Sequence, residues 1–169
     1  MLIRTAAGPD LARLQDIERS AGACFRDIGM PEVADDAPPG TDELAAYAKA
    51  GRAWVAVPDG SPEPAAYLIA EEIDGNLHIE QVSVHADHAR QGLGRALIDH
   101  AAEHAAAHGL PALTLTTFRD VPWNAPYYTR LGFRPLADDE LGPGLRRIRT
   151  AEAAHGLDRW PRTTMIRPL

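Results

Sequence analysis

The spacing of apolar residues changes several times along the chain, and each change indicates a different element. The stretch from Leu2 to Thr5 predicts a short first strand. Behind it, Leu11, Leu14, Ile17 and Glu18 recur at the three-to-four-residue spacing of one helix face. The chain therefore begins with a strand followed by an amphipathic helix.

Between residues 22 and 40 this periodicity is lost, and glycine, proline and acidic residues dominate. Such a composition predicts a loop or a short irregular helix, and long segments of this kind in compact domains are often functional. Thr41 begins a second predicted helix, which Gly51 ends.

The middle of the chain is typical of an antiparallel meander. Strands are expected at 53–57, 65–71 and 77–84, and turn residues at 58–62 and 74–76 separate them. In the third strand the two faces are expected to hold Leu77, Ile79 and Gln81 on one side and His78, Glu80, Val82 and Val84 on the other.

The period then returns to that of a helix. An alanine-rich helix is predicted from 92 to 109 and a β-branched strand at 112–117. Because a helix joins the strands 77–84 and 112–117, we expect these two strands to be parallel. The remaining predicted elements are a short helix at 125–131, a strand from Phe133, a helical stretch at 140–156 and a last strand at 163–167.

These elements predict an α/β fold with a mixed, mostly antiparallel central sheet and flanking helices. The length of 169 residues suits a single domain over 1–169. No stretch approaches the roughly 20 apolar residues of a membrane span. The first residues lack the features of a signal peptide, so we expect a cytoplasmic protein without a membrane partner.

The charge and the cysteine content narrow the classes of function. The net charge of −7 argues against a dedicated nucleic-acid binder and is compatible with a cationic substrate such as an amine. The single cysteine, Cys24, excludes an intrachain disulfide and a cysteine-based zinc cluster. We therefore expect no metal site and no nucleic-acid partner.

The strongest local signal is a glycine turn, His88-Ala89-Arg90-Gln91-Gly92-Leu93-Gly94-Arg95-Ala96-Leu97, between a predicted strand and a predicted helix. Glycines leave the backbone open to a ligand, and the first N–H groups of a helix have no intrahelical partner. A phosphate would satisfy these groups, and Arg90 and Arg95 add positive charge. The residues alone leave two alternatives, a phosphate site and an ordinary tight turn. The turn is neither a P-loop nor a full dinucleotide fingerprint, whose third glycine would fall at Leu97.

With its flanks, this turn resembles the core of the GNAT superfamily of acyl-CoA N-acyltransferases. Val82-Ser83-Val84 precedes the turn, as the thioester-binding strand does in that family. The segment from Ala89 to Gly94 is similar to the family's Gln/Arg-x-x-Gly-x-Gly/Ala signature. Tyr127 to Phe133 matches its Tyr-x-x-x-Gly-Phe ending. The resemblance covers about residues 65–136 and implies acetyl-CoA as cofactor, with CoA as product.

The chain departs from the family pattern at two positions. The first signature position is Ala89, and the nearest basic side chain is Arg90. The resemblance then leaves the backbone N–H groups of Gln91, Gly92, Leu93, Gly94, Arg95 and Ala96 to hold the pyrophosphate. Asn124 lies four residues before Tyr128, whereas the family's asparagine lies seven before the tyrosine, so Asn124 would hold the cofactor in a different register.

The resemblance implies direct attack of an amine on the acetyl carbonyl, without an acyl-enzyme. The backbone of Val82, Ser83 and Val84 would polarise the thioester oxygen. Tyr128 occupies the family's general-acid position, although an aromatic residue packed beside the cofactor is the alternative. Glu80 is the preferred base and His78 its rival, against the alternative of two half-buried strand residues with ordinary polar partners. The side chain of Ser83, like Cys24, is expected to be structural, because no nucleophile is required.

The acceptor pocket is expected from loops that the family uses for this purpose. Phe25, Met30, Phe118 and Trp123, with Glu80, would hold a small-molecule amine, although each apolar residue fits an ordinary core equally well. The stretch 140–160 is a further candidate for this pocket. Three alternatives stay open: a peptide or protein acceptor, a longer acyl donor, and a non-catalytic acyl-CoA-binding module suggested by Ala89. The resemblance is also compatible with a homodimer.

Overall fold

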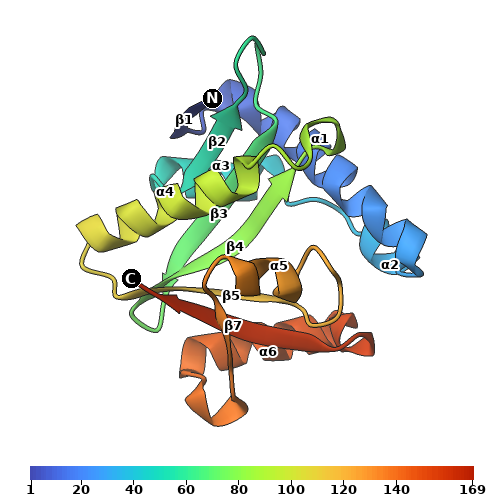
Figure 1. Cartoon of the computed structure of the whole chain (residues 1–169), viewed down its shortest axis with the longest axis vertical. Helices are drawn as coiled ribbons and strands as arrows, with labels where there is room; N and C mark the ends of the chain where they lie inside the picture. Colours follow the sequence, from blue (N-terminus) through green and yellow to red (C-terminus); the bar gives the residue numbers. More distant parts are fainter. The chain divides into compact units, whose positions relative to one another are not determined.

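The computed structural model describes all residues 1–169, and its elements follow the predicted order (Figure 1). The strands are β1 (Leu2–Thr5), β2 (Ala53–Val57), β3 (Ala66–Ile73), β4 (Asn76–Val84), β5 (Ala112–Phe118), β6 (Arg134–Leu136) and β7 (Arg162–Pro168). The α-helices are α1 (Leu11–Ala23), α2 (Pro31–Ala34), α3 (Thr41–Lys49), α4 (Leu93–Ala107), α5 (Ala125–Arg130) and α6 (Pro143–Ala154). Short 3₁₀ turns complete the order: η1 (Gly8–Asp10), η2 (Cys24–Ile28), η3 (Ala86–His88), η4 (Asp138–Glu140) and η5 (Leu157–Arg159).

The strands form one sheet in the order β1-β2-β3-β4-β5-β7-β6. The pairs β1–β2, β2–β3, β5–β7 and β6–β7 are antiparallel. The pair β4–β5 is parallel, with Leu77 opposite Leu113 and His78 opposite Thr114, which confirms the crossover expected from the sequence. The predicted mixed, mostly antiparallel α/β fold is therefore confirmed.

The contacts within the chain divide it into two compact units. Unit 1 comprises residues 1–70 and 81–100, and unit 2 comprises residues 71–80 and 101–169. The chain passes between the units within β3, β4 and α4, because each of these elements contributes residues to both. That residues 1–169 form a single domain stays a prediction.

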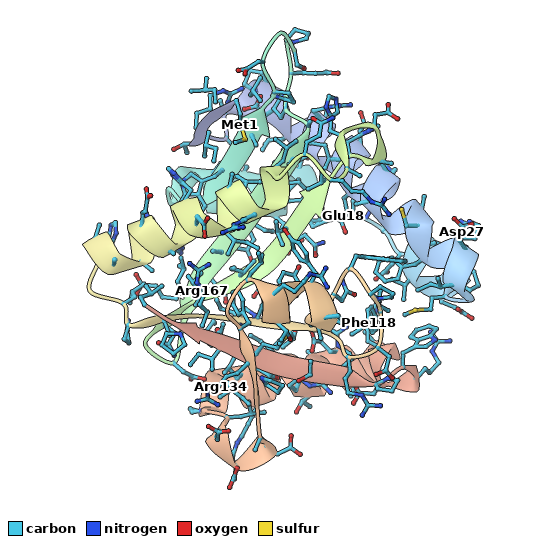
Figure 2. The ribbon with its side chains drawn as sticks, viewed as in Figure 1. Met1, Glu18, Asp27, Phe118, Arg134 and Arg167 are labelled. Carbon is cyan, nitrogen blue, oxygen red and sulfur yellow. The ribbon has the colours of Figure 1, made fainter.

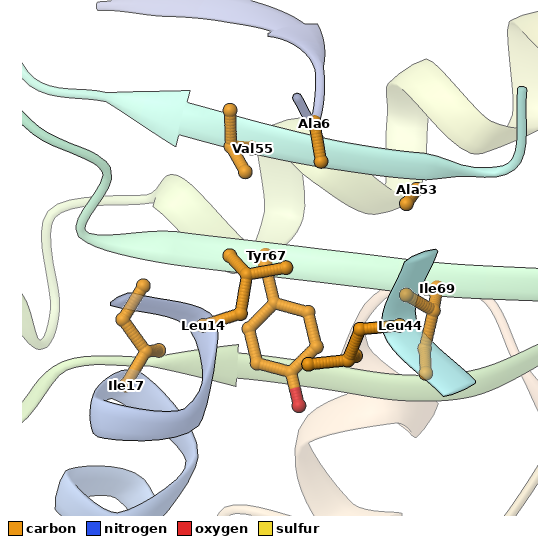
Figure 3. Packing of buried hydrophobic residues seen from close by; sticks show 8 residues of the cluster. All are labelled: Ala6, Leu14, Ile17, Leu44, Ala53, Val55, Tyr67 and Ile69. Atoms are coloured by element: carbon orange, nitrogen blue, oxygen red, sulfur yellow. The ribbon is translucent and has the colours of Figure 1, made fainter. Parts of the chain in front are cut away.

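The core of unit 1 lies under α1 and α3. Leu14 and Ile17 of α1 and Leu44 of α3 pack against Val55 of β2 and Tyr67 of β3 (Figure 3). The helical spacing seen in the sequence thus marks the buried face of α1. The opposite face of β2 meets α4, since Trp54 makes an edge-to-face contact with the ring of His100 at 5.7 Å between centroids.

In unit 2, α5 and α6 lie on opposite faces of β5 and β7 (Figure 1). The β3–β4 turn holds the start of α6, because the Asp74 carboxylate accepts hydrogen bonds from the N–H groups of Gly144 (2.8 Å) and Leu145 (2.9 Å). A carboxylate at this point satisfies unpaired helix donors and complements the helix dipole. The first residues of α6 therefore lie close to the β3–β4 turn.

This close approach predicts that Gly144→Ala destabilises the protein. A Cβ at Gly144 would lie 2.6 Å from Ile73 Cγ2 and 2.8 Å from Asp74 Oδ1. Overpacking of this kind costs about 1–3 kcal/mol, which over most of that range is more than the helix-propensity gain of about 1 kcal/mol for replacing glycine by alanine. Urea unfolding should show a lower midpoint for this variant. Gly8→Ala is the control, because a Cβ at Gly8 meets nothing within 4 Å. An equal midpoint for both variants would contradict the expectation.

The helix α1 includes residues 22 and 23, and the rest of the segment to residue 40 forms the short helical turns η2 and α2 followed by irregular chain, as the sequence predicted. The helical stretch expected at 140–156 is η4 followed by α6, and the last strand extends by one residue at each end. No helix has the length and apolarity that a membrane crossing needs.

Candidate functional site

The glycine turn connects η3 to α4 within unit 1. Two of its residues have positive φ angles, Arg90 at 63° and Gly92 at 79°. Gly92 adopts this conformation readily because it has no Cβ. For Arg90 the same region costs about 1–2 kcal/mol, and residues held there cluster at functional sites. The turn is therefore a constrained backbone feature rather than an arbitrary loop.

The start of α4 presents a row of unsatisfied donors. The N–H groups of residues 91–95 donate to no backbone carbonyl, as the first turn of a helix requires. Ala96 differs, because its N–H donates to the carbonyl of Gly92 at 3.0 Å. The expectation that the Ala96 amide is free for a ligand is therefore wrong, since this amide already belongs to the helix ladder. The amides of Gln91, Gly92, Leu93, Gly94 and Arg95 remain.

Positive charge accompanies these donors. The side chains of Arg90 and Arg95 are exposed. Arg95 Nε lies 3.8 Å from Asp99 Oδ2 one helical turn later, a contact that leaves most of its side chain in solvent. The helix N-terminus adds the positive end of the dipole of a 15-residue helix. This arrangement can bind a phosphate or a diphosphate.

The segment Val82–Val84 ends β4 in unit 1 and leads toward the turn. Val82 and Val84 are half-buried, whereas Ser83 is buried. The parallel ladder of β4 with β5 consists of the pairs at Leu77 and His78, and β4 runs on to Val84. The N–H groups of residues 82–84 therefore lie beyond the paired part of this ladder.

Tyr128 and Asn124 belong to unit 2. Tyr128 is 8% exposed, and its ring makes edge-to-face contacts with Tyr127 (5.4 Å) and Phe133 (5.8 Å). The Asn124 carbonyl accepts the N–H of Tyr128 at 3.0 Å, so Asn124 begins α5. Its side-chain amide donates to the carbonyl of Trp123 at 3.2 Å. A backbone hydrogen bond thus connects Asn124 and Tyr128, the two candidates from the sequence, in the first turn of α5.

The two candidate bases have different surroundings on β4. Glu80 is half-buried. His78 is buried, and its Nδ1 lies 2.9 Å from Thr114 Oγ1. Burial lowers the pKa of His78 to about 4, although Glu152 and Asp74 act in the opposite direction. A buried, neutral imidazole with so low a pKa is a poor acceptor for an ammonium proton. That Glu80 is the base stays a prediction.

The expected acceptor residues are distributed over both units. Phe25 is half-buried and Met30 is buried, and a backbone hydrogen bond from Met30 N–H to the Phe25 carbonyl (3.0 Å) joins them in unit 1. In unit 2, Phe118 is buried, whereas Trp123 is 38% exposed (Figure 2 labels Phe118). The structure therefore does not gather these four side chains within one unit.

Buried Phe118 contacts a half-buried ionic cluster that sequence reasoning missed. The Arg162 guanidinium lies 4.5 Å from the Phe118 ring centre and donates to Glu152 Oε2 (2.8 Å) and Thr116 Oγ1 (3.2 Å). Arg149 donates to the other oxygen of Glu152 at 2.9 Å. The sequence does not predict this cluster. The run Arg146-Arg147-Ile148-Arg149 is equally typical of a solvent-exposed helix face.

A second missed residue is Glu18, whose carboxylate accepts a hydrogen bond from Ser83 Oγ at 2.6 Å. The sequence did carry a signal. Glu18 follows Leu11 and Leu14 at helical spacing, so a carboxylate continues the apolar stripe of α1. An acidic residue on the buried face of a helix needs a polar partner.

Comparison with known proteins identifies the fold and a family. The family model described as "Acetyltransferase (GNAT) family" matches residues 14–133. The N-acetylglutamate synthase of Neisseria gonorrhoeae, complexed with coenzyme A and N-acetyl-glutamate, is 15% identical with a TM-score of 0.71, and the match covers 99% of this chain and 35% of that chain. The chain thus spans about a third of that enzyme.

Two further solved structures match along most of their own length. The ribosomal-protein-S18-alanine N-acetyltransferase of Escherichia coli is 20% identical with a TM-score of 0.65, covering 99% of this chain and 92% of that chain. The PaiA N-acetyltransferase of Thermoplasma acidophilum, in complex with coenzyme A, is 12% identical with a TM-score of 0.67, covering 99% and 98%. At these identities the likeness shows the fold.

Proposed function

Because this chain belongs to the acetyltransferase (GNAT) family, we propose that it transfers the acetyl group of acetyl-CoA to the primary amine of a small molecule. The observation that carries this proposal is the row of free N–H groups at residues 91–95, at the start of α4. In the N-acetylglutamate synthase and the PaiA enzyme, structures of the same fold contain coenzyme A. The exposed Arg90 and Arg95 supply charge for its phosphates.

The proposed reaction is a direct attack in a ternary complex. The amine nitrogen forms a bond to the acetyl carbonyl carbon, the carbon–sulfur bond breaks, and the sulfur leaves as the thiol of CoA. Backbone N–H groups of Val82–Val84 stabilise the charge that develops on the carbonyl oxygen, an effect worth roughly 3 kcal/mol of the barrier for one donor. Their position beyond the β4–β5 ladder supports this role.

Three proton transfers complete the proposed reaction. Glu80 first removes one proton from the ammonium, directly or through a water molecule, so that the neutral amine can attack. Its half-buried place on β4, together with the low pKa of buried His78, supports this choice. Tyr128 gives its phenolic proton to the leaving sulfur. The place of this tyrosine in the Tyr-x-x-x-Gly-Phe segment, which begins within α5 and continues beyond its end, supports that role. The nitrogen then loses its second excess proton as the neutral amide forms, and this proton restores the phenol of Tyr128 once it has protonated the leaving sulfur.

Two measurements test the proposal. Calorimetry should show binding of acetyl-CoA and of CoA, and a panel of amines should release free thiol from acetyl-CoA with at least one acceptor. The panel should hold small amines, amino acids and peptides with free N-termini, so that it also distinguishes the acceptor classes. Binding without thiol release across the panel would instead favour a non-catalytic acyl-CoA-binding protein. Absence of binding would exclude both functions.

A further inference from the structure

Four side chains in unit 1 form a hydrogen-bonded cluster between α1 and β4. Ser83 Oγ and Tyr67 Oη donate to the same oxygen of Glu18, Oε2, at 2.6 and 2.9 Å. Gln81 Nε2 donates to Ser83 Oγ at 2.8 Å. Figure 2 labels Glu18 on α1, and Figure 3 shows Tyr67 beside Leu14 and Ile17 of the same helix. The cluster connects residues 65 positions apart in the chain.

The directions of these hydrogen bonds are fixed. Because Ser83 accepts from Gln81, its own proton is directed to Glu18. Tyr67 is completely buried, and burial together with the neighbouring Glu18 raises its pKa well above the usual value, so it remains a donor. Glu18 Oε2 therefore acts as the common acceptor of both hydroxyl groups. Ser83 and Tyr67 are buried and Glu18 and Gln81 are half-buried, and a hydrogen-bonded network shielded from water in this way favours one arrangement.

A second hydrogen bond attaches α1 just beyond the end of β4. Ser20 Oγ accepts the backbone N–H of Ala86 at 2.9 Å, and Ala86 begins η3, which leads into the glycine turn. Helix α1 thus holds the chain on both sides of Val84, at Ser83 and at Ala86. Glu18 and Ser20 therefore restrain the backbone that joins the end of β4 to the turn.

We propose that Glu18 is a positioning residue for acyl transfer. By holding Ser83, it fixes the backbone of Val82–Val84, whose N–H groups polarise the thioester carbonyl in the proposed function, on which this inference rests. Donors of this kind stabilise a developing charge only when they are held in place before the reaction, and small displacements are costly. Glu18 acts through Ser83 and is not required to touch either substrate.

The test compares Glu18→Leu with Glu18→Gln. The amide oxygen of glutamine can accept both hydroxyl hydrogen bonds, whereas leucine accepts none. We expect Glu18→Leu to lower kcat about tenfold, less than the roughly 100- to 1,000-fold loss for removing such a donor outright, because the donors are loosened rather than removed, with little change in the KM for acetyl-CoA. Glu18→Gln should recover most of this loss. Asp16→Leu is the matched control, because Asp16 is an exposed carboxylate on the same helix. An equal loss of kcat in Glu18→Leu and Glu18→Gln would show that the charge of Glu18 matters rather than its hydrogen bonds, and it would overturn the proposal.

A readout independent of turnover separates this inference from the proposed function. Amide hydrogen exchange at Val82–Val84 should be faster in Glu18→Leu than in the native protein and near native in Glu18→Gln. Ser83→Ala removes a single oxygen and should disturb the packing less than Glu18→Leu does, and it should accelerate exchange of the same amides. Unchanged exchange in both Glu18→Leu and Ser83→Ala would overturn the inference. Absence of thiol release from the native protein would overturn the proposed function and, with it, the role of Glu18 in acyl transfer, whereas the exchange experiment would still decide whether Glu18 restrains the backbone of Val82–Val84.

Discussion

Replacing Tyr128 by phenylalanine should lower kcat by at least about 100-fold, the lower end of what general acid–base catalysis contributes. The change removes one oxygen and keeps the ring that contacts Tyr127 and Phe133 at 5.4 and 5.8 Å. The helix and its packing should therefore survive, and calorimetric binding of CoA should stay close to that of the native protein. Steady-state release of thiol from acetyl-CoA, with the best amine of the panel, measures the effect.

Tyr127→Phe is the matched control for this experiment. Tyr127 is the preceding residue, is half-buried, and has the Arg130 guanidinium 5.8 Å from its ring centre. The phenylalanine ring would keep that contact, so kcat should change little. Native turnover in Tyr128→Phe would remove this hydroxyl from the mechanism. An equal fall in both variants would indicate a general effect on α5 rather than a specific proton transfer.

The alternation of residues along β4 shows how much of the fold could be predicted. Period-two spacing in 77–84 and helical spacing in 92–109 sufficed to predict a parallel crossover, because local periodicity and the handedness of connections determine it. The register confirms it at Leu77–Leu113. The glycine turn was also recognisable, since its donors are a consequence of helix geometry. Only the first five of its six expected amides are free, because the helix ladder already includes Ala96.

Burial by distant segments could not be predicted in the same way. The unperturbed pKa of a histidine suits a general base. In the structure, however, His78 is buried and hydrogen-bonded to Thr114, 36 residues away in the chain. The charges that act on it come from Asp74 and Glu152, and the place of Glu152 depends on how α6 starts against the hairpin. Glu18 is the intermediate case. Its place on an apolar stripe is visible in the sequence, whereas its partners on β3 and β4 are brought to it only by the tertiary fold.

Gly92→Val should weaken the binding of CoA by at least about tenfold, which corresponds to 1.4 kcal/mol. Gly92 has a φ of 79°, where a β-branched residue is strained, so the variant should relax toward negative φ and turn the neighbouring amides away from a bound diphosphate. Gly109→Val provides the matched control at the other end of the same helix. Gly109 has a φ of 70°, and a Cβ at either glycine would meet nothing within 4 Å. Both variants should lose similar stability in thermal unfolding, whereas calorimetry should find weaker CoA binding in Gly92→Val alone. Native affinity in Gly92→Val, or an equal loss in both variants, would show that the turn does not hold the diphosphate.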